Sequence, residues 1–307
     1  METLYRNGRR NADRRFDQTQ NQPCKSQGSA VGPQLTDKIA VVAIARDEKP
    51  FMDEWLLYHR LIGVDHFLVY DDDPNPGLQE FLNPHREYTT VLRWYDPKTV
   101  GTQQLLAYRD ALNYRLSDFQ WVAFIDLDEF IVLDKHANLK EFIASLGDAS
   151  AARIIWHRFG HNGRYDDPTL VTAELTRRKL LPCTNRWKSL TRCDAIANIT
   201  CVHNCDLKQG YSFEVTDAAH INHYMCRSFT RWMNRPERGD ANDLLLTTKN
   251  AWKHTKRGCL RKFVERVALD WNEHEDKSML KFKQSLEQAI TAIRTNHPHT
   301  ENAMTSK

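Results

Sequence analysis

Short apolar runs alternate with amphipathic segments along the first half of the chain. The run Ile39–Ala45 is apolar throughout, which predicts a parallel strand buried on both faces. Residues Pro50 to Ile62 carry apolar side chains at helical spacing and predict a helix, which Gly63 ends. The segment His66–Tyr70 then predicts a second strand.

The alternation continues with a strand at Tyr88–Trp94, a helix at Thr102–Leu116 and a fourth strand at Val122–Ile125. Strands and helices of this length in alternation predict right-handed βαβ units. The expected fold class is therefore α/β, with a mostly parallel, Rossmann-like sheet flanked by helices.

The pattern is less regular in the second half. It predicts a helix at Leu139–Leu146, a strand at Ala152–Trp156 and a loop at Phe159–Asp167. The segments Val171–Thr176 and Trp187–Cys193 are interpreted as antiparallel strands at the far side of the sheet.

Three regions follow from these patterns. Residues 1–36 are polar and basic without apolar periodicity, and predict a disordered tail for which contact with anionic lipid is the alternative to simple solvation. Residues 37–235 form the α/β domain. Residues 236–307 are expected to be a helical extension packed on the same domain, closing with an amphipathic helix from Met279 to Ile293.

Composition narrows the class of protein. The 307 residues are 41% hydrophobic, which suffices for a substantial core, and a formal charge of +3 is too small to indicate a nucleic-acid partner. No apolar run reaches the length of a membrane span or a secretory signal, and the seven cysteines are irregularly spaced. We therefore expect a cytoplasmic protein with reduced thiols, with peripheral contact at the inner membrane face as the variant suggested by the tail.

Carboxylates follow three of the four predicted strands. Asp126, Asp128 and Glu129 come directly after the fourth strand, and acidic residues also follow the first and second. Two aspartates separated by one residue can direct both carboxylates at one divalent cation, which can in turn hold a diphosphate. The simpler alternative is an acidic turn that solvates a strand end.

Downstream histidines and cysteines offer further ligands. His203, His220 or His223 could complete the shell of a manganese-type ion whose other ligands are oxygens. A structural zinc site is the competing hypothesis, because the sequence clusters five possible ligands: Cys183, Cys193, Cys201, His203 and Cys205. Only Cys201 and Cys205 have the spacing of a zinc-binding pair, and the sequence has no second pair of this kind.

Several reaction classes lack their motifs here. The chain has no Gly-x-Ser-x-Gly elbow, no glycine-rich phosphate loop and no dinucleotide fingerprint after the first strand. Chemistry at a metal-bound diphosphate would instead need a general base for the acceptor, for which the candidates are Asp166, Asp167 and Glu129.

Over residues 38–240 the chain resembles glycosyltransferase family 92 and related family 2-like sequences. The resemblance rests on an ordered series of short motifs: Ala45-Arg-Asp-Glu48, Glu54-Trp55, Tyr58-His59, Gly63-Val-Asp-His-Phe67, Tyr70-Asp71, Trp121 to Phe130, Phe159-Gly160, Lys188-Ser189, His203, His223-Tyr224, Arg227-Ser228 and Arg238-Gly239.

The resemblance implies a GT-A fold and a hexosyltransferase that moves a sugar from a UDP-linked donor with Mn²⁺ or Mg²⁺. It assigns the metal to Asp126, Asp128 and His203, with His223 as the second choice for the histidine. The residues expected to contact the donor are Arg46, Glu48, Asp71, Asp126 and Lys188.

The expected acceptor is a hydroxyl of a glycan or of a lipid-linked precursor of a polysaccharide. Inverting transfer is expected, because a single displacement needs no protein nucleophile. The loop Asp72-Asp73-Pro74-Asn75-Pro76 departs from the family pattern, which leaves the donor sugar open. Two other functions remain: a catalytically inactive nucleotide-sugar or polysaccharide-binding protein, and a zinc-stabilised interaction module.

Overall fold

The computed structural model describes residues 37–97, 102–238, 255–268 and 271–297. All of them belong to one compact unit, Leu35–Lys307. The predicted basic tail, residues 1–36, lies outside the described residues.

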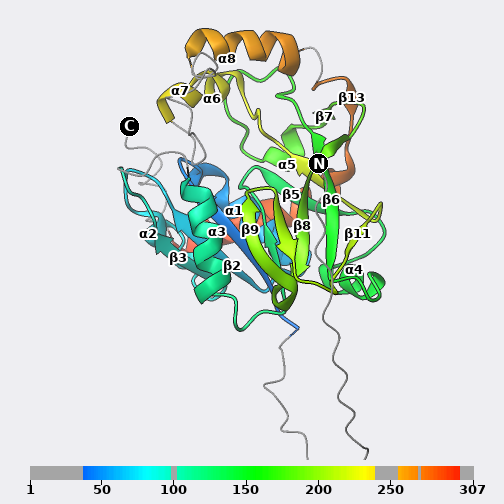
Figure 1. Ribbon diagram of the computed structural model, residues 1–307. Coiled ribbons are helices and arrows are strands. Elements are labelled where there is room, and N and C mark those ends of the chain that lie inside the picture. The colour runs from blue at the N-terminus through cyan, green and yellow to red at the C-terminus, as the bar shows by residue number, and fades with distance from the viewer. Residues whose placement is uncertain (1–36, 98–101, 239–254, 269–270, 298–307) are drawn as a thin grey trace, which may run out of the picture. The chain divides into compact units, whose positions relative to one another are not determined.

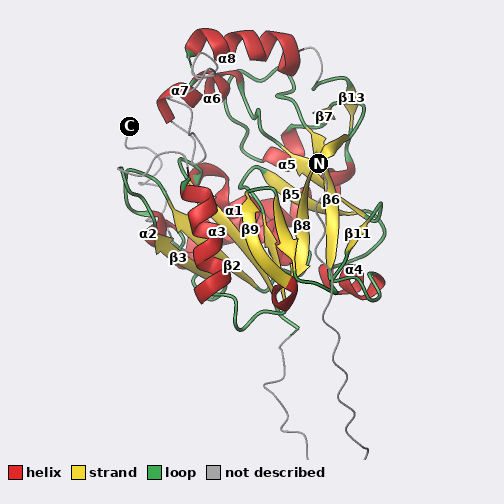
Figure 2. Cartoon of the chain, in the orientation of Figure 1, coloured by secondary structure: helices red, strands yellow, loops and turns green. Residues whose placement is uncertain are grey.

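Strands and helices alternate as far as the fourth strand, and the order then becomes irregular (Figures 1 and 2). The strands are β1 (Ile39–Ala45), β2 (His66–Asp71), β3 (Thr89–Arg93), β4 (Trp121–Phe124), β5 (Glu129–Leu133), β6 (Ala151–Arg158), β7 (Arg177–Arg178), β8 (Cys183–Arg192), β9 (Ile196–Cys201), β10 (Asn204–Leu207), β11 (Phe213–Val215), β12 (Ala219–His223) and β13 (His274–Glu275). The α-helices are α1 (Lys49–Leu61), α2 (Leu78–Phe81), α3 (Gln103–Tyr114), α4 (Leu139–Ser145), α5 (Val171–Glu174), α6 (Phe229–Met233), α7 (Arg235–Arg238), α8 (Lys256–Lys262) and α9 (Lys283–Asn296). The segment Phe263–Ala268 continues α8 as a π-helix.

The main sheet has the order β3-β2-β1-β4-β8-β6-β12-β5, and β11 pairs with β6. Five of its eight pairings are parallel. This confirms the predicted α/β class with a mostly parallel sheet flanked by helices. Because β8 is antiparallel to both β4 and β6, those two strands run in the same direction, and β12 is parallel to β6. The carboxyl ends of β1, β2, β4, β6 and β12 therefore meet at one edge of the sheet.

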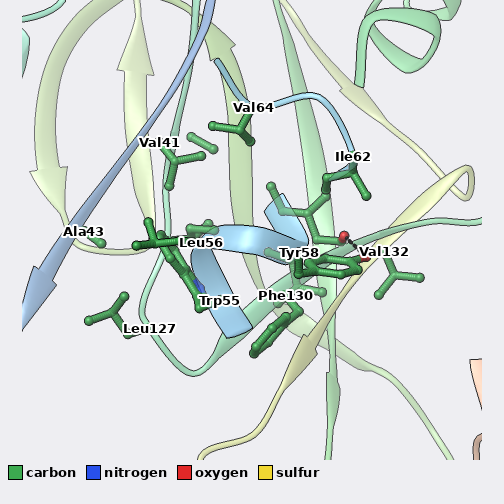
Figure 3. Close-up of a cluster of buried hydrophobic side chains, with 14 of the residues drawn as sticks. Val41, Ala43, Trp55, Leu56, Tyr58, Ile62, Val64, Leu127, Phe130 and Val132 are labelled. Carbon is green, nitrogen blue, oxygen red and sulfur yellow. Dashed lines mark hydrogen bonds between the residues drawn. The ribbon is translucent and has the colours of Figure 1, made fainter. Parts of the chain in front are cut away.

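Alternate residues of β1 belong to different cores on the two faces of the sheet. Val41 and Ala43 pack with α1, as Figure 3 shows for Trp55 and Leu56. Ala40 and Val42 instead pack in a second core with α3 and the β9–β10 hairpin. Burial on both faces explains why β1 is apolar throughout.

The C-terminal helix α9 packs against α1. The ring of Phe282, just before α9, lies edge-on to the ring of Tyr58 with centroids 5.1 Å apart, and Leu286 of α9 is fully buried. The proposed boundary at residue 236 stays a prediction. In the part of the chain that the structure describes, no helix is both long enough and apolar enough to cross a membrane.

Two strand predictions were wrong in place or type. The segment Val171–Thr176 contains the helix α5, because the buried carboxylate of Glu54 accepts hydrogen bonds from the Val171 and Thr172 N–H groups at its first turn. The strand predicted at Trp187–Cys193 is part of β8, which lies in the middle of the sheet and not at its far side. Its outer half, Cys183–Arg186, is largely exposed, so its pattern resembles that of an edge strand.

Candidate active site

The acidic loop between β4 and β5 is held from two sides. Within the loop, the Glu129 Oε2 atom accepts a 2.9 Å hydrogen bond from the Asp126 N–H. From the segment after β12, the Tyr224 N–H donates to the Asp128 carbonyl at 2.7 Å, and Arg227 Nη2 donates to the Leu127 carbonyl at 2.8 Å. The backbone is thus fixed, while the carboxylates of Asp126 and Asp128 remain partly exposed.

Asp126 contacts a buried cation. Lys188 of β8 is 1% exposed, and its Nζ lies 3.2 Å from Asp126 Oδ1 and 3.4 Å from Glu129 Oε2. The same carboxylate oxygen accepts hydrogen bonds from Gln104 Nε2 and the Tyr108 hydroxyl of α3. Lys188 was predicted to contact the donor, whereas Gln104 and Tyr108 were not singled out from the sequence.

Burial shifts the pKa values of the two ionisable side chains beneath this loop, Glu129 and Lys188. It raises the pKa of Glu129 to about 8, although Lys188 opposes the shift. Burial alone would lower the pKa of Lys188, but Asp126 and Glu129 together raise it, so the ammonium stays charged. Glu129 has no exposed surface. It therefore supports the loop from below, with its carboxylate shielded from solvent.

Asp128 pairs with a histidine from β12. The distance from Asp128 Oδ1 to His223 Nε2 is 3.4 Å. Burial would raise the pKa of Asp128, but His223 and then Arg227 lower it. Burial would likewise lower the pKa of His223, but Asp128 raises it. Each of the two side chains thus favours the charged form of the other.

The predicted ligand His203 packs against the same indole ring as His223. The Trp156 ring centroid is 5.3 Å from that of His203 and 4.4 Å from that of His223. Burial, followed by the charge of Lys188, lowers the pKa of His203 to about 4, so its imidazole is neutral. The Nδ1 atoms of both histidines are buried without a hydrogen-bond partner among the described residues.

No group of three or more His, Cys, Asp and Glu side chains in the described ranges is already arranged to hold a metal ion. The predicted ligands Asp126, Asp128 and His203 therefore do not form an assembled metal site. The cysteines of the zinc hypothesis do not form one either, and Cys205 Sγ instead contacts the hydroxyls of Ser189 and Thr191. Around Asp128, however, the residue types suit an oxygen-preferring cation: two partly exposed carboxylates and the His223 imidazole, whose Nε2 faces Asp128. These side chains are of the right chemical type to bind such an ion, although they are not yet arranged around a common metal position.

The predicted donor-binding residues lie at the ends of β1 and β2, on the same edge. Arg46 Nη2 is 2.6 Å from Asp72 Oδ2, and Arg93 Nη1 is 2.8 Å from Asp71 Oδ2. Asp72 is completely buried, and its Oδ1 atom has no hydrogen-bond partner among the described residues. Arg46 and Asp71 are thus brought together around Asp72.

Glu48 joins a second cluster, which the sequence did not predict. It forms ion pairs with Arg227 and with Arg231, and the Arg227 guanidinium also stacks on Phe51 at 4.0 Å from the ring centroid. Arg227 appeared in the sequence only within the motif Arg227-Ser228 and had no assigned role. Its contact with the Leu127 carbonyl connects the β1–α1 loop to the acidic loop.

The candidate bases differ in position. Asp167 accepts a 2.6 Å hydrogen bond from the Ser228 hydroxyl, and its carboxylate lies 3.5 Å from Arg231 Nη1. Asp166 makes one longer contact, 3.4 Å to the Thr230 hydroxyl. Both aspartates are exposed, whereas Glu129 is buried. The structure therefore brings Asp167 to the Arg227–Arg231 cluster and keeps Glu129 away from solvent.

Comparison with known proteins places this chain among glycosyltransferases. Residues 44–267 match the description of glycosyltransferase family 92. The chain is 30% identical over 194 residues to the family 92 protein Os08g0121900 of Oryza sativa subsp. japonica, covering 61% of this chain and 33% of that protein. It is 30% identical over 197 residues to the family 92 protein RCOM_0530710 of Ricinus communis, covering 58% and 33%.

The match thus spans about a third of the length of these curated relatives. Among solved structures, HddC from Yersinia pseudotuberculosis is similar at 13% identity and a TM-score of 0.35, over 61% of this chain and 93% of that one. A score this low supports no conclusion about the present site.

Proposed function

This chain belongs to glycosyltransferase family 92, and from that membership we propose that it transfers a sugar from a nucleotide-sugar donor to a hydroxyl group of a glycan or lipid-linked acceptor. The observation that carries the proposal is the contact of Asp128 with His223, in the loop that also carries Asp126, at the edge where β1, β2 and β4 end. Ligands of α/β sheets bind outside this edge.

A divalent cation, Mn²⁺ or Mg²⁺, belongs to the proposal. Asp126 and Asp128 would hold it, and the 3.4 Å contact with Asp128 supports His223 over His203 as the imidazole ligand. When bound, the ion supplies positive charge next to the diphosphate leaving group.

Other residues of the chain would contact the donor and position the acidic loop. Arg46 and Asp71 at the ends of β1 and β2 would contact the UDP part of the donor. Lys188 holds Asp126 in place, since its Nζ is 3.2 Å from that carboxylate. Glu129, through its hydrogen bond to the Asp126 N–H, positions the acidic loop and is not the base.

Asp167 is the proposed general base. Its carboxylate is exposed at the sheet edge and oriented by Ser228 and Arg231. In an inverting displacement it would accept the proton of the acceptor hydroxyl while that oxygen bonds to the anomeric carbon and the bond to the diphosphate breaks.

The decisive experiment is a thermal-shift screen of nucleotide sugars, with and without Mn²⁺, followed by assays of transfer and donor hydrolysis. Stabilisation by one UDP-sugar that a chelator abolishes would support donor and metal together. Absence of a response to every nucleotide would refute the proposal. Tight UDP binding without transfer or hydrolysis would instead favour the inactive binding protein.

A further inference from the structure

A second candidate site lies beside the acidic loop. It is a cavity of about 190 Å³ between the end of β6, the segment after β12, and the helices α6 to α8 with their π-helical continuation. Its lining residues are Arg158, Met225, Trp232, Arg235, Cys259, Lys262, Arg266 and Trp271.

The lining combines positive charge with aromatic rings. Four of the lining side chains are Arg or Lys, and none of those that the structure describes is Asp or Glu. The Nε atom of Arg158 is buried without a hydrogen-bond partner in the described ranges. A buried guanidinium N–H without an acceptor favours an anion that can receive its hydrogen bond.

Two indole rings form part of the wall. Trp232 and Trp271 are edge-to-face with centroids 6.0 Å apart, and the Arg235 guanidinium lies 5.1 Å from the Trp232 ring centroid. The Trp232 Nε1–H donates to the Cys259 carbonyl at 2.8 Å, which fixes the ring. Rigid indoles beside cations suit an anion attached to a carbon skeleton.

The cavity is close to the proposed reaction centre. Met225 lines it, and the preceding residue, Tyr224, donates its N–H to the Asp128 carbonyl at 2.7 Å. Arg158 ends β6, which lies on the opposite side of β4 from β1 and β2 in the sheet. If the nucleotide occupies the ends of β1 and β2, this cavity faces the other substrate.

We propose that the cavity binds an anionic group, a phosphate or a carboxylate, that is carried by the sugar acceptor. The inference rests on the proposed function and adds the acceptor class to it. The volume equals about six water molecules at roughly 30 Å³ each, enough for the anionic group and part of one sugar ring. The anion is bound and takes no part in bond exchange, which occurs at a hydroxyl of the acceptor.

Calorimetric titration of the full chain tests the cavity without relying on turnover. The probes are glucose, glucose 6-phosphate and glucuronate, which share a ring and differ in charge. We expect at least one anionic probe to bind at least tenfold more tightly than glucose, and the stronger of the two identifies phosphate or carboxylate. Lys262→Gln and Arg266→Gln should each weaken anion binding about tenfold, and Lys262→Arg should restore it.

Arg261→Gln is the matched control. Arg261 precedes Lys262 on the same helix but is 65% exposed, pairs with Glu265 and does not line the cavity. This variant should bind all three probes as the unmodified chain does. Equal weakening in Arg261→Gln, or equal affinity for all three probes, would overturn the inference.

Three further outcomes separate this inference from the proposed function. If UDP displaces glucose 6-phosphate in competition, the cavity belongs to the donor and the acceptor assignment fails. If a UDP-sugar stabilises the protein but no anionic probe binds, the inference fails while the proposed function stands. If anions bind the cavity but no nucleotide binds the chain, the proposed function fails and the cavity is not an acceptor site.

Discussion

His223 Nε2 lies 3.4 Å from Asp128 Oδ1. This contact joins strand β12 to the acidic loop after β4. The contact depends on β12 pairing with β6, and on the Tyr224 N–H holding the Asp128 carbonyl. It supports His223 over His203 as the histidine on which the proposed metal site depends.

We predict that His223→Ala raises the Mn²⁺ concentration needed for half-maximal transfer by a factor on the order of 10–100, since one imidazole ligand is removed. His203→Ala should change it much less, because the described residues include a contact between Asp128 and His223 and none between Asp128 and His203. Initial rates across a Mn²⁺ series give the comparison. Equal effects of the two substitutions would contradict the assignment.

Asp128→Asn keeps the size of the side chain and removes its charge. We expect transfer to fall by roughly 10²–10³-fold, because the leaving diphosphate loses electrostatic stabilisation. Initial rates at saturating donor, together with a melting curve to show that the fold is kept, provide the measurement. Full transfer activity in this variant would refute the role of the acidic loop.

Arg227 is predicted to act as a positioning residue. Arg227→Lys should lose the Nη2 hydrogen bond to the Leu127 carbonyl and lower kcat about tenfold with a smaller change in donor KM, since a misplaced loop affects the transition state most. The control is Arg60→Lys, because Arg60 also donates to a backbone carbonyl, that of Val64, but at the far end of α1. A loss in KM alone would indicate that Arg227 binds the donor directly.

Lys188 is predicted to be essential for stability as well as for the site. Lys188→Met leaves Asp126 and Glu129 without their buried cation, which should lower the free energy of unfolding by about 3–5 kcal/mol. Adding Asp126→Asn should recover part of that loss, because the carboxylate left without its cation is then replaced by a neutral amide. Urea unfolding gives the free energy of unfolding of the single and the double variant. A double variant no more stable than Lys188→Met would argue against charge compensation.

His59 should make stability depend on pH. Burial lowers its pKa to about 3, and its Nε2 accepts a hydrogen bond from the Ile131 N–H, so the folded state keeps the imidazole neutral. Between roughly pH 6.5 and 3 the unfolded chain binds a proton that the folded chain does not. The free energy of unfolding should therefore fall on acidification by up to about 1.4 kcal/mol per pH unit, with no contribution above pH 6.5.

Urea unfolding across this pH range measures the slope. His59→Gln should reduce it, while His274→Gln, at an exposed position of β13, should leave it unchanged. An identical slope in His59→Gln and the unmodified chain would show that other groups are responsible.

The local pattern of apolar residues was sufficient to predict the strands and helices in the first half of the molecule. The apolar runs of β1, β2 and β4 and the helical spacing of α1 and α3 are properties of short segments, so their places could be predicted within a few residues. Parallel strands end at the same edge, so the sequence also indicated that Arg46, Asp71 and Asp126 would lie near one another.

The rest depended on pairings between distant segments. The antiparallel strand β8 lies between β4 and β6 and carries Lys188 to Asp126, and β12 carries His223 to Asp128. Neither partner can be found from periodicity, because a strand's neighbours are chosen by packing of the whole sheet. The sequence by itself determined which carboxylates follow the strands; only the tertiary structure decided which cations meet them, since those contacts form between residues far apart in the chain.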